Sequence, residues 1–299
     1  MTKKTELTYT KRPSIAASYL RAIFLRRKGL KPGESLPDIS AAWDQVALDP
    51  ALLKRYHEAC ELPVDGYMPI LYPHVIASPV YMSILTNKNF PFPLIGALHL
   101  RNHIIEHRRV KADEVFDMKV QLTEKRIVKQ GIEFDFTIVL TIGQEKVWES
   151  VTTWLKQGKF GKEYDDSPNA GLLKTDPEAR HFKDLEIPRG IGKKFAKITG
   201  DYNPIHMSKL LAPLFGLKRD VAHAMWACAN SMAHLPALPE GKPVRVDFAF
   251  KGPLFLDNKS HIRVSERSGG IRFDYYCGDN DRPGINGDIS LVEKGMKIS

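Results

Sequence analysis

The sequence predicts an α+β protein in which one pattern, a helix followed by four long antiparallel strands, occurs twice. Side chains alternate between apolar and polar at period two along both sets of strands, as in Phe134–Leu140 and Val244–Phe250. The expected strands of the first half are Leu94–Glu106, Glu114–Val128, Ile132–Ile142 and Lys146–Trp154. Those of the second half are Val244–Lys251, Ser260–Glu266, Gly270–Tyr276 and Gly287–Val292.

Each set of strands follows a short apolar helix candidate. The segment Ala222–Ala233 is apolar on nearly every face, and Pro236 and Pro239 follow it. A helix that is hydrophobic all round is a buried one, so we expect the sheet to wrap around it. Pro79–Thr86 is the counterpart in the first half. The second half should open with a strand over 180–188 and a short helix over 192–198, while 67–74 reads as strand or loop.

We divide the chain into four parts: an N-terminal helical extension (1–65), a first helix-and-sheet unit (66–157), a polar linker (158–177) and a second unit (178–299). In the extension, Ser14 is placed to cap a helix that runs to Arg27 with Ile15 and Tyr19 on its apolar face. This basic helix could dock on the body of the protein, contact a membrane or a carrier protein, or belong to a cleaved transit peptide.

Composition bounds the class of protein. The chain has 299 residues, of which 43% are hydrophobic and 26% charged, as is usual for a globular protein of two domains. No apolar run is long enough to cross a membrane. Cys60, Cys228 and Cys277 show no metal-ligand spacing, so we expect reduced thiols and a cytoplasmic location. The net charge of +9 suggests an anionic partner, but the basic residues are scattered and no nucleic-acid motif is evident.

The octet Thr199–His206 carries most of the chemical information. It reads Thr-Gly-Asp-Tyr-Asn-Pro-Ile-His and places a carboxylate and an imidazole five positions apart. Gly200 permits unusual backbone angles, and Pro204 excludes Asn203 from the α region. Such a turn can aim Asp201 and His206 at one point, as acid–base chemistry on an uncharged substrate requires.

The octet resembles the signature Ser/Thr-Gly-Asp-x-Asn-Pro-x-His of the MaoC-like dehydratases and (R)-specific enoyl-CoA hydratases. The family's following His-Gly-Met is matched at His223 and Met225, whereas Ala224 replaces the glycine. The resemblance implies a hotdog fold, in which a curved antiparallel sheet wraps a long helix. Two copies in one chain imply a double hotdog. The first copy lacks the signature and would be a degenerate, non-catalytic hotdog.

The resemblance also implies an activity: reversible addition of water to trans-2-enoyl thioesters, giving (R)-3-hydroxyacyl thioesters in fatty-acid metabolism. Asp201 and His206 would be the acid–base pair. Gly200, Asn203, His223, Ala224 and Met225 would form the substrate and oxyanion site. The thioester would be acyl-CoA or acyl carrier protein, with no further cofactor and no metal. A homodimer is possible.

Two other functions remain open at this point. A hotdog thioesterase would release a free thiol from acyl-CoA. A non-catalytic acyl-thioester-binding protein would bind the same substrates without turnover, and Ala224 together with the inert first unit favours it.

Overall fold

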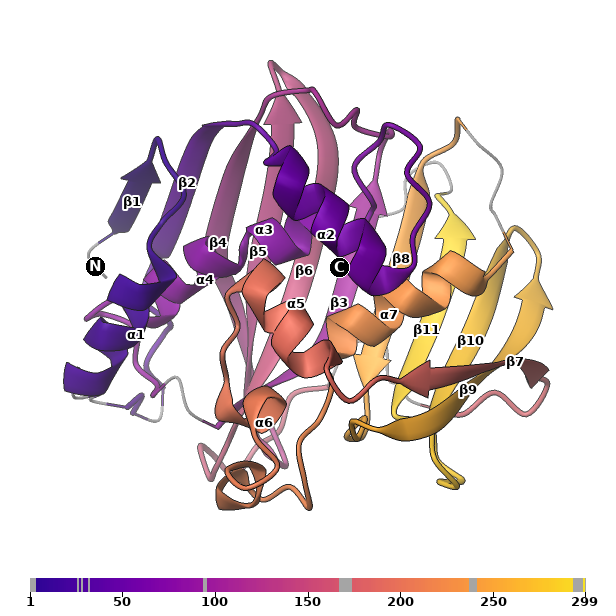
Figure 1. The fold of residues 1–299 in the computed structure, drawn as a ribbon. Coiled ribbons are helices and arrows are strands. Elements are labelled where there is room, and N and C mark those ends of the chain that lie inside the picture. The colour runs from indigo at the N-terminus through magenta and orange to yellow at the C-terminus, as the bar shows by residue number, and fades with distance from the viewer. Residues whose placement is uncertain are drawn as a thin grey trace.

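The computed structural model describes residues 4–25, 27, 29–31, 33–93, 96–166, 174–236, 241–292 and 298. These residues form one eleven-stranded sheet with the helices gathered on its concave face (Figure 1). The strands are β1 (Thr5–Tyr9), β2 (Ile39–Val46), β3 (Ala97–Glu106), β4 (Phe116–Val128), β5 (Gly131–Ile142), β6 (Glu145–Gln157), β7 (Arg180–Ile187), β8 (Val244–Phe250), β9 (Asn258–Arg267), β10 (Gly270–Cys277) and β11 (Ile285–Leu291). The helices are α1 (Ile15–Phe24), α2 (Pro50–Cys60), α3 (Tyr72–Ile76), α4 (Ser78–Leu85), α5 (Ile191–Thr199), α6 (Pro204–Met207), α7 (Ala224–His234) and the 3₁₀ turn η2 (Ala212–Phe215).

The strand order shows two equivalent halves. It runs β1-β2-β4-β5-β6-β3-β8-β11-β10-β9-β7, so β2-β4-β5-β6-β3 is mirrored by β7-β9-β10-β11-β8. The halves join where β3 pairs antiparallel with β8, from Arg101 opposite Ala249 to Glu106 opposite Val244. Each half encloses its own apolar helix, α4 in the first and α7 in the second. The predicted double hotdog is confirmed.

The N-terminal segment 1–65 was predicted to be helical, and the structure corrects this. β1 and β2 are strands, and β2 occupies the same place in the first half as β7 does in the second. The first structural unit therefore begins at Ile39 and not at residue 66. The strand was missed because its sequence, Ile-Ser-Ala-Ala-Trp-Asp-Gln-Val, combines buried alanines with residues of weak strand preference.

The stretch 67–74, read as strand or loop, contributes an isolated bridge at Tyr67 and the start of α3. Part of the predicted linker, 167–173, lies outside the described residues. Its two ends are anchored. Asp165 exchanges hydrogen bonds with Ile127, and Asp176 accepts hydrogen bonds from Ser265 and Arg267.

The two halves are tied together above the sheet by α2 and α7. Helix α2 ends with backbone carbonyls that have no partner within the helix. Side chains of the second half satisfy them: Trp226 Nε1 donates to the Ala59 carbonyl at 2.7 Å and Asn230 Nδ2 to the Cys60 carbonyl at 3.3 Å. The core is therefore continuous across the halves.

The three cysteines were expected to be reduced thiols. Cys60, Cys228 and Cys277 are free, and all three are buried. Among the described residues, no helix has both the length and the apolar character needed to span a membrane.

Three buried imidazoles predict how stability depends on pH. Burial lowers the pKa of His74 to about 4, that of His99 well below its usual value and that of His223 to about 3. Below pH 6.5 the unfolded chain binds protons at these positions that the folded protein does not, so the free energy of unfolding should decrease as pH decreases. Each proton of difference contributes about 1.4 kcal/mol per pH unit.

Glu106 acts in the opposite direction. Burial raises its pKa to about 7, so its contribution to stability is present below its ordinary pKa and lost as pH rises through 7. The combined effect of the three histidines on the free energy of unfolding is larger than the opposite effect of Glu106. Urea denaturation should give a lower free energy of unfolding at pH 5 than at pH 7. Glu106→Gln should make the decrease steeper. A free energy that is flat, or higher at pH 5, would contradict this account.

Candidate active site

Gly200 ends helix α5 in the left-handed conformation. Its φ is +78°, and its N–H donates to the Ala196 carbonyl. A side chain here would be strained by that φ, and a Cβ would also lie 2.0 Å from Cδ1 of Ile15 on α1. Gly200 thus turns the chain sharply into the signature loop and lets α1 lie directly against it. The structure shows this backbone role for Gly200, and its place among the substrate residues stays a prediction.

The loop after Gly200 is held by its own side chains. Thr199 Oγ1 accepts a hydrogen bond from the Asp201 N–H at 3.0 Å, and Asp201 Oδ1 accepts one from the Asn203 N–H at 3.1 Å. Asn203 Oδ1 in turn accepts from the Ile205 N–H and caps α6. Asn203 therefore braces the loop, and its part in the substrate site stays a prediction. One carboxylate oxygen of Asp201 is used in the turn, and Oδ2 remains for the site.

His206 is fixed from two directions. Its Nδ1–H donates to the Val221 carbonyl at 2.9 Å, which leaves Nε2 as the nitrogen with a lone pair. Its own carbonyl oxygen packs against Gly192 on α5 so closely that a Cβ there would lie 2.2 Å away. Gly192 is thus required for α5 and α6 to approach. The predicted helix over 192–198 contained this residue, but nothing in the sequence marked it as a contact point.

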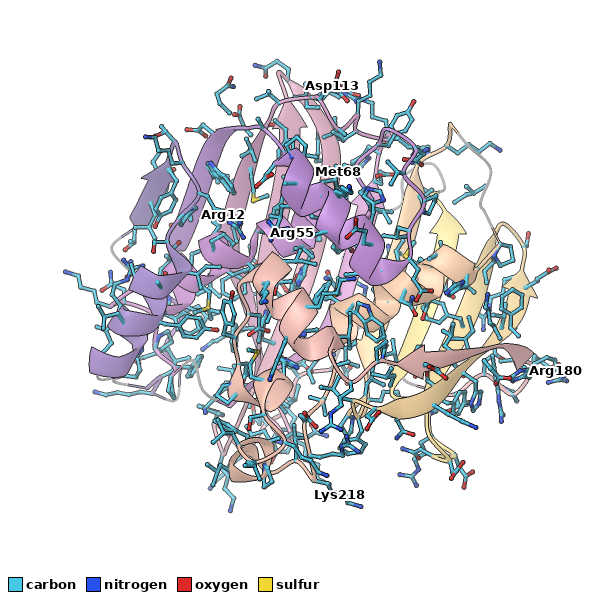
Figure 2. The ribbon with its side chains drawn as sticks, in the orientation of Figure 1. Arg12, Arg55, Met68, Asp113, Arg180 and Lys218 are labelled. Carbon is cyan, nitrogen blue, oxygen red and sulfur yellow. The ribbon has the colours of Figure 1, made fainter. Side chains whose placement is uncertain are left out.

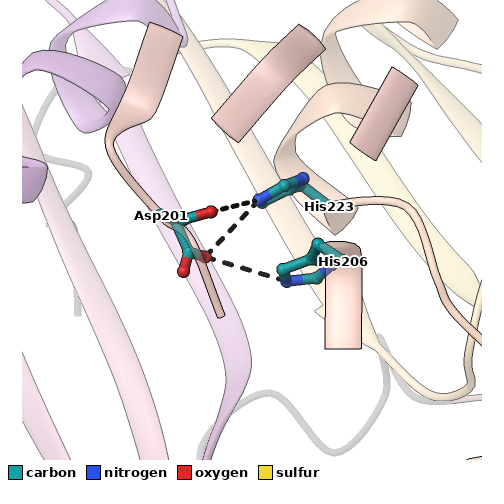
Figure 3. A group of neighbouring side chains, drawn as sticks. All are labelled: Asp201, His206 and His223. Carbon is teal, nitrogen blue, oxygen red and sulfur yellow. Dashed lines mark hydrogen bonds and ion pairs between the residues drawn. The ribbon is translucent and has the colours of Figure 1, made fainter. Parts of the chain in front are cut away.

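Asp201, His206 and His223 converge (Figure 3). Asp201 Oδ2 lies 3.7 Å from Nε2 of His206 and 3.6 Å from Nε2 of His223. The two imidazoles stack, with ring centroids 3.7 Å apart. The distance from Asp201 to His206 is too long for a direct hydrogen bond, but a single water about 2.8 Å from each atom can join them. Asp201 is the exposed member of this group, and His206 and His223 are largely covered.

His223 is neutral at physiological pH. Burial, followed by the neighbouring charge of His206, lowers its pKa to about 3. Its Nε2–H donates to the backbone carbonyl of Asp201 at 3.2 Å. Nδ1 has no hydrogen-bond partner among the described residues. His223 is thus satisfied by a backbone carbonyl, and its place in the substrate site stays a prediction.

Helix α7 begins beside these three residues. His223 is its N-cap residue but makes no side-chain capping bond, so the N–H groups of Ala224 and Met225 have no acceptor within the helix. The helix dipole adds partial positive charge at this end. The methyl group of Ala224 is only partly buried, and Met225 is buried. N–H groups of this kind can donate to a carbonyl oxygen of a bound molecule.

The first half contributes polar side chains that the sequence did not single out. Asn102 Nδ2 lies 3.7 Å from the sulfur of Met225 and 3.2 Å from Nδ1 of His74. Its Oδ1 accepts a hydrogen bond from Thr152, whose hydroxyl also bonds that of Tyr81. This chain of buried polar groups reaches from the first hotdog to the start of α7. The alternation of side chains along β3 could have predicted that Asn102 faces inward, but it could not have predicted the contact with Met225.

Helix α1 supplies a second unexpected neighbour, Tyr19. Burial raises the pKa of Tyr19 to about 12, and the negative charge of Asp201 adds to the effect. Tyr19 is therefore within electrostatic reach of the carboxylate. The sequence predicted an apolar face on this helix, and the structure shows that the face covers the signature loop. The predicted end of the helix at Arg27 moves back to Phe24.

The same triad has the donor set of a metal site. The ligand atoms of Asp201, His206 and His223 all lie within 4.8 Å of one another, and two imidazoles with one carboxylate suit a transition metal. A metal would have to displace the Nε2 proton of His223 from its bond to the Asp201 carbonyl. The arrangement as it stands serves hydrogen bonding, and the absence of a resident metal stays a prediction.

Comparison with known proteins identifies the part of the chain that carries the site. Residues 176–274 match the family described as MaoC like domain. The matched stretch contains Asp201, His206, His223 and the whole of α7. The residues that converge in the structure therefore all lie within it.

Relatives resemble the chain well beyond this domain. The chain is 28% identical over 238 residues to 3-hydroxyacyl-thioester dehydratase X of Mycobacterium tuberculosis, which covers 79% of this chain and 84% of the relative. The crystal structure of HtdX from the same organism matches with a TM-score of 0.73 at 25% identity, over 85% of this chain and 100% of that one. A MaoC-like dehydratase from Phytophthora capsici matches in fold, with a TM-score of 0.67 at 15% identity, over 89% of this chain and 99% of that one.

The contact between Gly192 and His206 gives a prediction about the site. In Gly192→Ala, the added methyl would overlap the His206 carbonyl, so α6 must shift and carry the imidazole away from Asp201. We expect a cost of about 1–3 kcal/mol in stability and a loss of any His206-dependent activity of about 100-fold. Gly190→Ala is the matched control, because Gly190 has a φ of −85° and open space around it. Equal activity of the two variants would contradict the assignment.

Proposed function

We propose that the chain catalyses reversible hydration of trans-2-enoyl thioesters, and dehydration of (R)-3-hydroxyacyl thioesters, at Asp201 and His206. One observation carries the proposal. Asp201 Oδ2 and His206 Nε2 lie 3.7 Å apart, so one water beside the pair can bond to both atoms, next to the first N–H groups of α7. The relationship to a 3-hydroxyacyl-thioester dehydratase supports the same reaction.

His206 is the base that we assign to the attacking water. Its Nδ1–H is committed to the Val221 carbonyl, so Nε2 can accept a proton. As the proton transfers, the hydroxyl oxygen bonds to the β-carbon of the enoyl group. The stacked His223 is neutral, so it does not repel the imidazolium that forms. Acid–base assistance of this kind contributes about 10²–10⁴ to the rate.

The negative charge that develops on the thioester oxygen needs donors that are already in place. The Ala224 and Met225 N–H groups and the positive end of α7 supply them, at a contribution of about 10²–10³ per well-placed donor. Alanine in place of the family's glycine keeps the N–H. Its partly buried methyl group narrows the space beside the thioester, so we infer an effect on substrate fit and not on the chemistry.

The α-carbon must then gain a proton. Asp201 Oδ2 faces both histidines and is the group placed to relay the proton from His206 to that carbon. Addition of water is then complete, with its hydroxyl on the β-carbon and its proton on the α-carbon. The Asn203 N–H donates to Asp201 Oδ1 and the His223 Nε2–H donates to the Asp201 carbonyl, and these two bonds hold the carboxylate while Oδ2 takes part.

The first hotdog is the supporting half in this proposal. Its helix α4 continues from α3 with Ala77 in helical conformation between them, and the Ala77 N–H bonds back to the Pro73 carbonyl. The start of α4 is thus covered, and Pro79 removes a further N–H. We infer that one half has an oxyanion site and the other does not. The proposal includes no cofactor beyond the CoA or phosphopantetheine of the substrate, and the buried free thiols favour a reducing compartment such as the cytoplasm.

Removal of either member of the pair tests the function. Asp201→Asn and His206→Ala should each lower kcat for trans-2-octenoyl-CoA by about 10²–10⁴, followed as loss of enoyl-thioester absorbance. Asp201 is partly exposed, so Asp201→Asn should keep its melting temperature within a few degrees of wild type, whereas His206→Ala also loses the bond to the Val221 carbonyl and should melt somewhat lower. His234→Gln, at the far end of α7, is the control and should keep full activity.

Three outcomes would contradict the proposed hydratase function. Full activity of Asp201→Asn or His206→Ala would remove the acid–base pair. Release of free thiol from saturated acyl-CoA by the wild-type protein would indicate a thioesterase instead. Tight binding of acyl thioesters of every chain length without turnover would indicate a binding protein.

A further inference from the structure

The loop that follows α6, Ser208–Arg219, lies next to the active site in the chain. It begins two residues after His206 and ends two residues before Val221, whose carbonyl fixes the His206 ring. Its backbone is ordered by hydrogen bonds of its own, from Leu211 N–H to the Ser208 carbonyl and from Leu214 N–H to the Leu211 carbonyl. Figure 1 shows this loop extending below α6, away from the sheet and its helices.

Large apolar side chains of this loop are exposed. Leu210 is 87% exposed and Leu214 is 78% exposed, and Leu211 and Phe215 are also open to solvent. A single exposed leucine is ordinary, but four large apolar residues within six positions of an ordered loop make a patch. Ala212, between them, is fully buried and anchors the turn. The loop therefore holds these side chains outward.

The patch lies within a strongly basic stretch. Between positions 189 and 219, Asp201 is the sole acidic residue, against seven basic ones: Arg189, Lys193, Lys194, Lys197, Lys209, Lys218 and Arg219. Lys209 and Lys218 flank the exposed leucines, and both are exposed. Within the described part of the chain, no ion pair neutralises either of them. Figure 2 places Lys218 at the end of the molecule where the loop extends.

We propose that the Ser208–Arg219 loop docks the acidic acyl carrier protein that delivers the thioester. The inference rests on the proposed function, because the partner is the carrier of that same substrate. Leucines and a phenylalanine ringed by lysines match a folded partner that presents apolar side chains among carboxylates. Docking beside His206 would direct the phosphopantetheine arm toward the start of α7.

Other occupants fit the loop less well. CoA offers phosphates for the lysines, but its adenine ring is a small surface for four outward-facing side chains, and its acyl chain must enter the active site. A second copy of the chain would bring Lys209 and Lys218 against the same lysines across a twofold axis, and such like-charge contacts are unfavourable. Helices that lie on membranes are long, whereas the ordered turn here, η2, has four residues.

The test compares one acyl chain on two carriers. Initial rates are measured with trans-2-octenoyl-CoA and with the same group on a purified acidic acyl carrier protein. Lys209→Glu/Lys218→Glu and Leu210→Ser/Leu214→Ser should each lower kcat/KM for the protein-bound substrate by about 10-fold or more. Both should leave kcat/KM for octenoyl-CoA within about twofold of wild type. Added salt should slow the reaction of the wild type with the carrier-bound substrate alone.

The control is Lys119→Glu/Lys129→Glu, which makes the same change in net charge at two exposed lysines of the first half. It should leave both rates unchanged. Because CoA turnover is measured in every variant, failure of the proposed function, which would abolish it in the wild type, is separate from failure of the docking surface.

Four results would overturn the docking proposal while leaving the activity intact. Wild-type turnover of octenoyl-CoA without turnover of the carrier-bound group is the first. Equal losses on both carriers in the loop variants would show a structural role. Conversion of a dimer to a monomer by the loop variants, seen by sedimentation velocity, would show a contact between copies. Leucine-dependent sedimentation with anionic phospholipid vesicles, with unchanged carrier rates, would show a membrane surface.

Discussion

The pairing of β3 with β8 is the contact on which the rest of the architecture depends. It joins two half-sheets of five equivalent strands into one and sets their concave faces side by side. Only in this arrangement can α2 of the first half meet α7 of the second, with Trp226 and Asn230 bonded to the carbonyls at the end of α2. The same pairing brings Asn102 on β3 to Met225 at the start of α7. The site thus contains side chains from both halves.

The two halves share a topology but differ at the helix start, and the difference is physical. In the second half, a turn built on Gly200 and Pro204 leads into α7 with its first N–H groups open. In the first half, α3 runs into α4 through Ala77, and the same position is filled by helical backbone. Stacked imidazoles also occur in both halves. His74 and His99 stack on each other in the first, and His206 and His223 in the second, and within the described part of the chain only the second pair faces a carboxylate.

Sequence alone was sufficient for the regular features. Alternation located the strands of both halves, the all-round apolar character of 222–233 located α7, and Ser14 was correctly read as a helix cap. The octet brought Asp201 and His206 together because a turn is a local structure that five or six residues determine. β2 was missed because its pattern becomes meaningful only beside β4. Gly192, Ile15 and Tyr19 were missed as site neighbours because each meets the loop through tertiary packing, which leaves no local signal.

The two edges of the sheet differ in how they are protected, and this affects the tendency of the protein to aggregate at high concentration. β1 pairs in parallel with β2 and covers an edge whose residues Ile39 and Ala41 are completely buried. At the opposite edge, β7 carries Lys183, Asp184 and Glu186 outward along its exposed side. Charged residues on an open edge discourage strand-by-strand growth of one sheet onto another. We infer that the short strand β1 protects one edge of the sheet from pairing with another molecule, and that the charged residues of β7 protect the other edge.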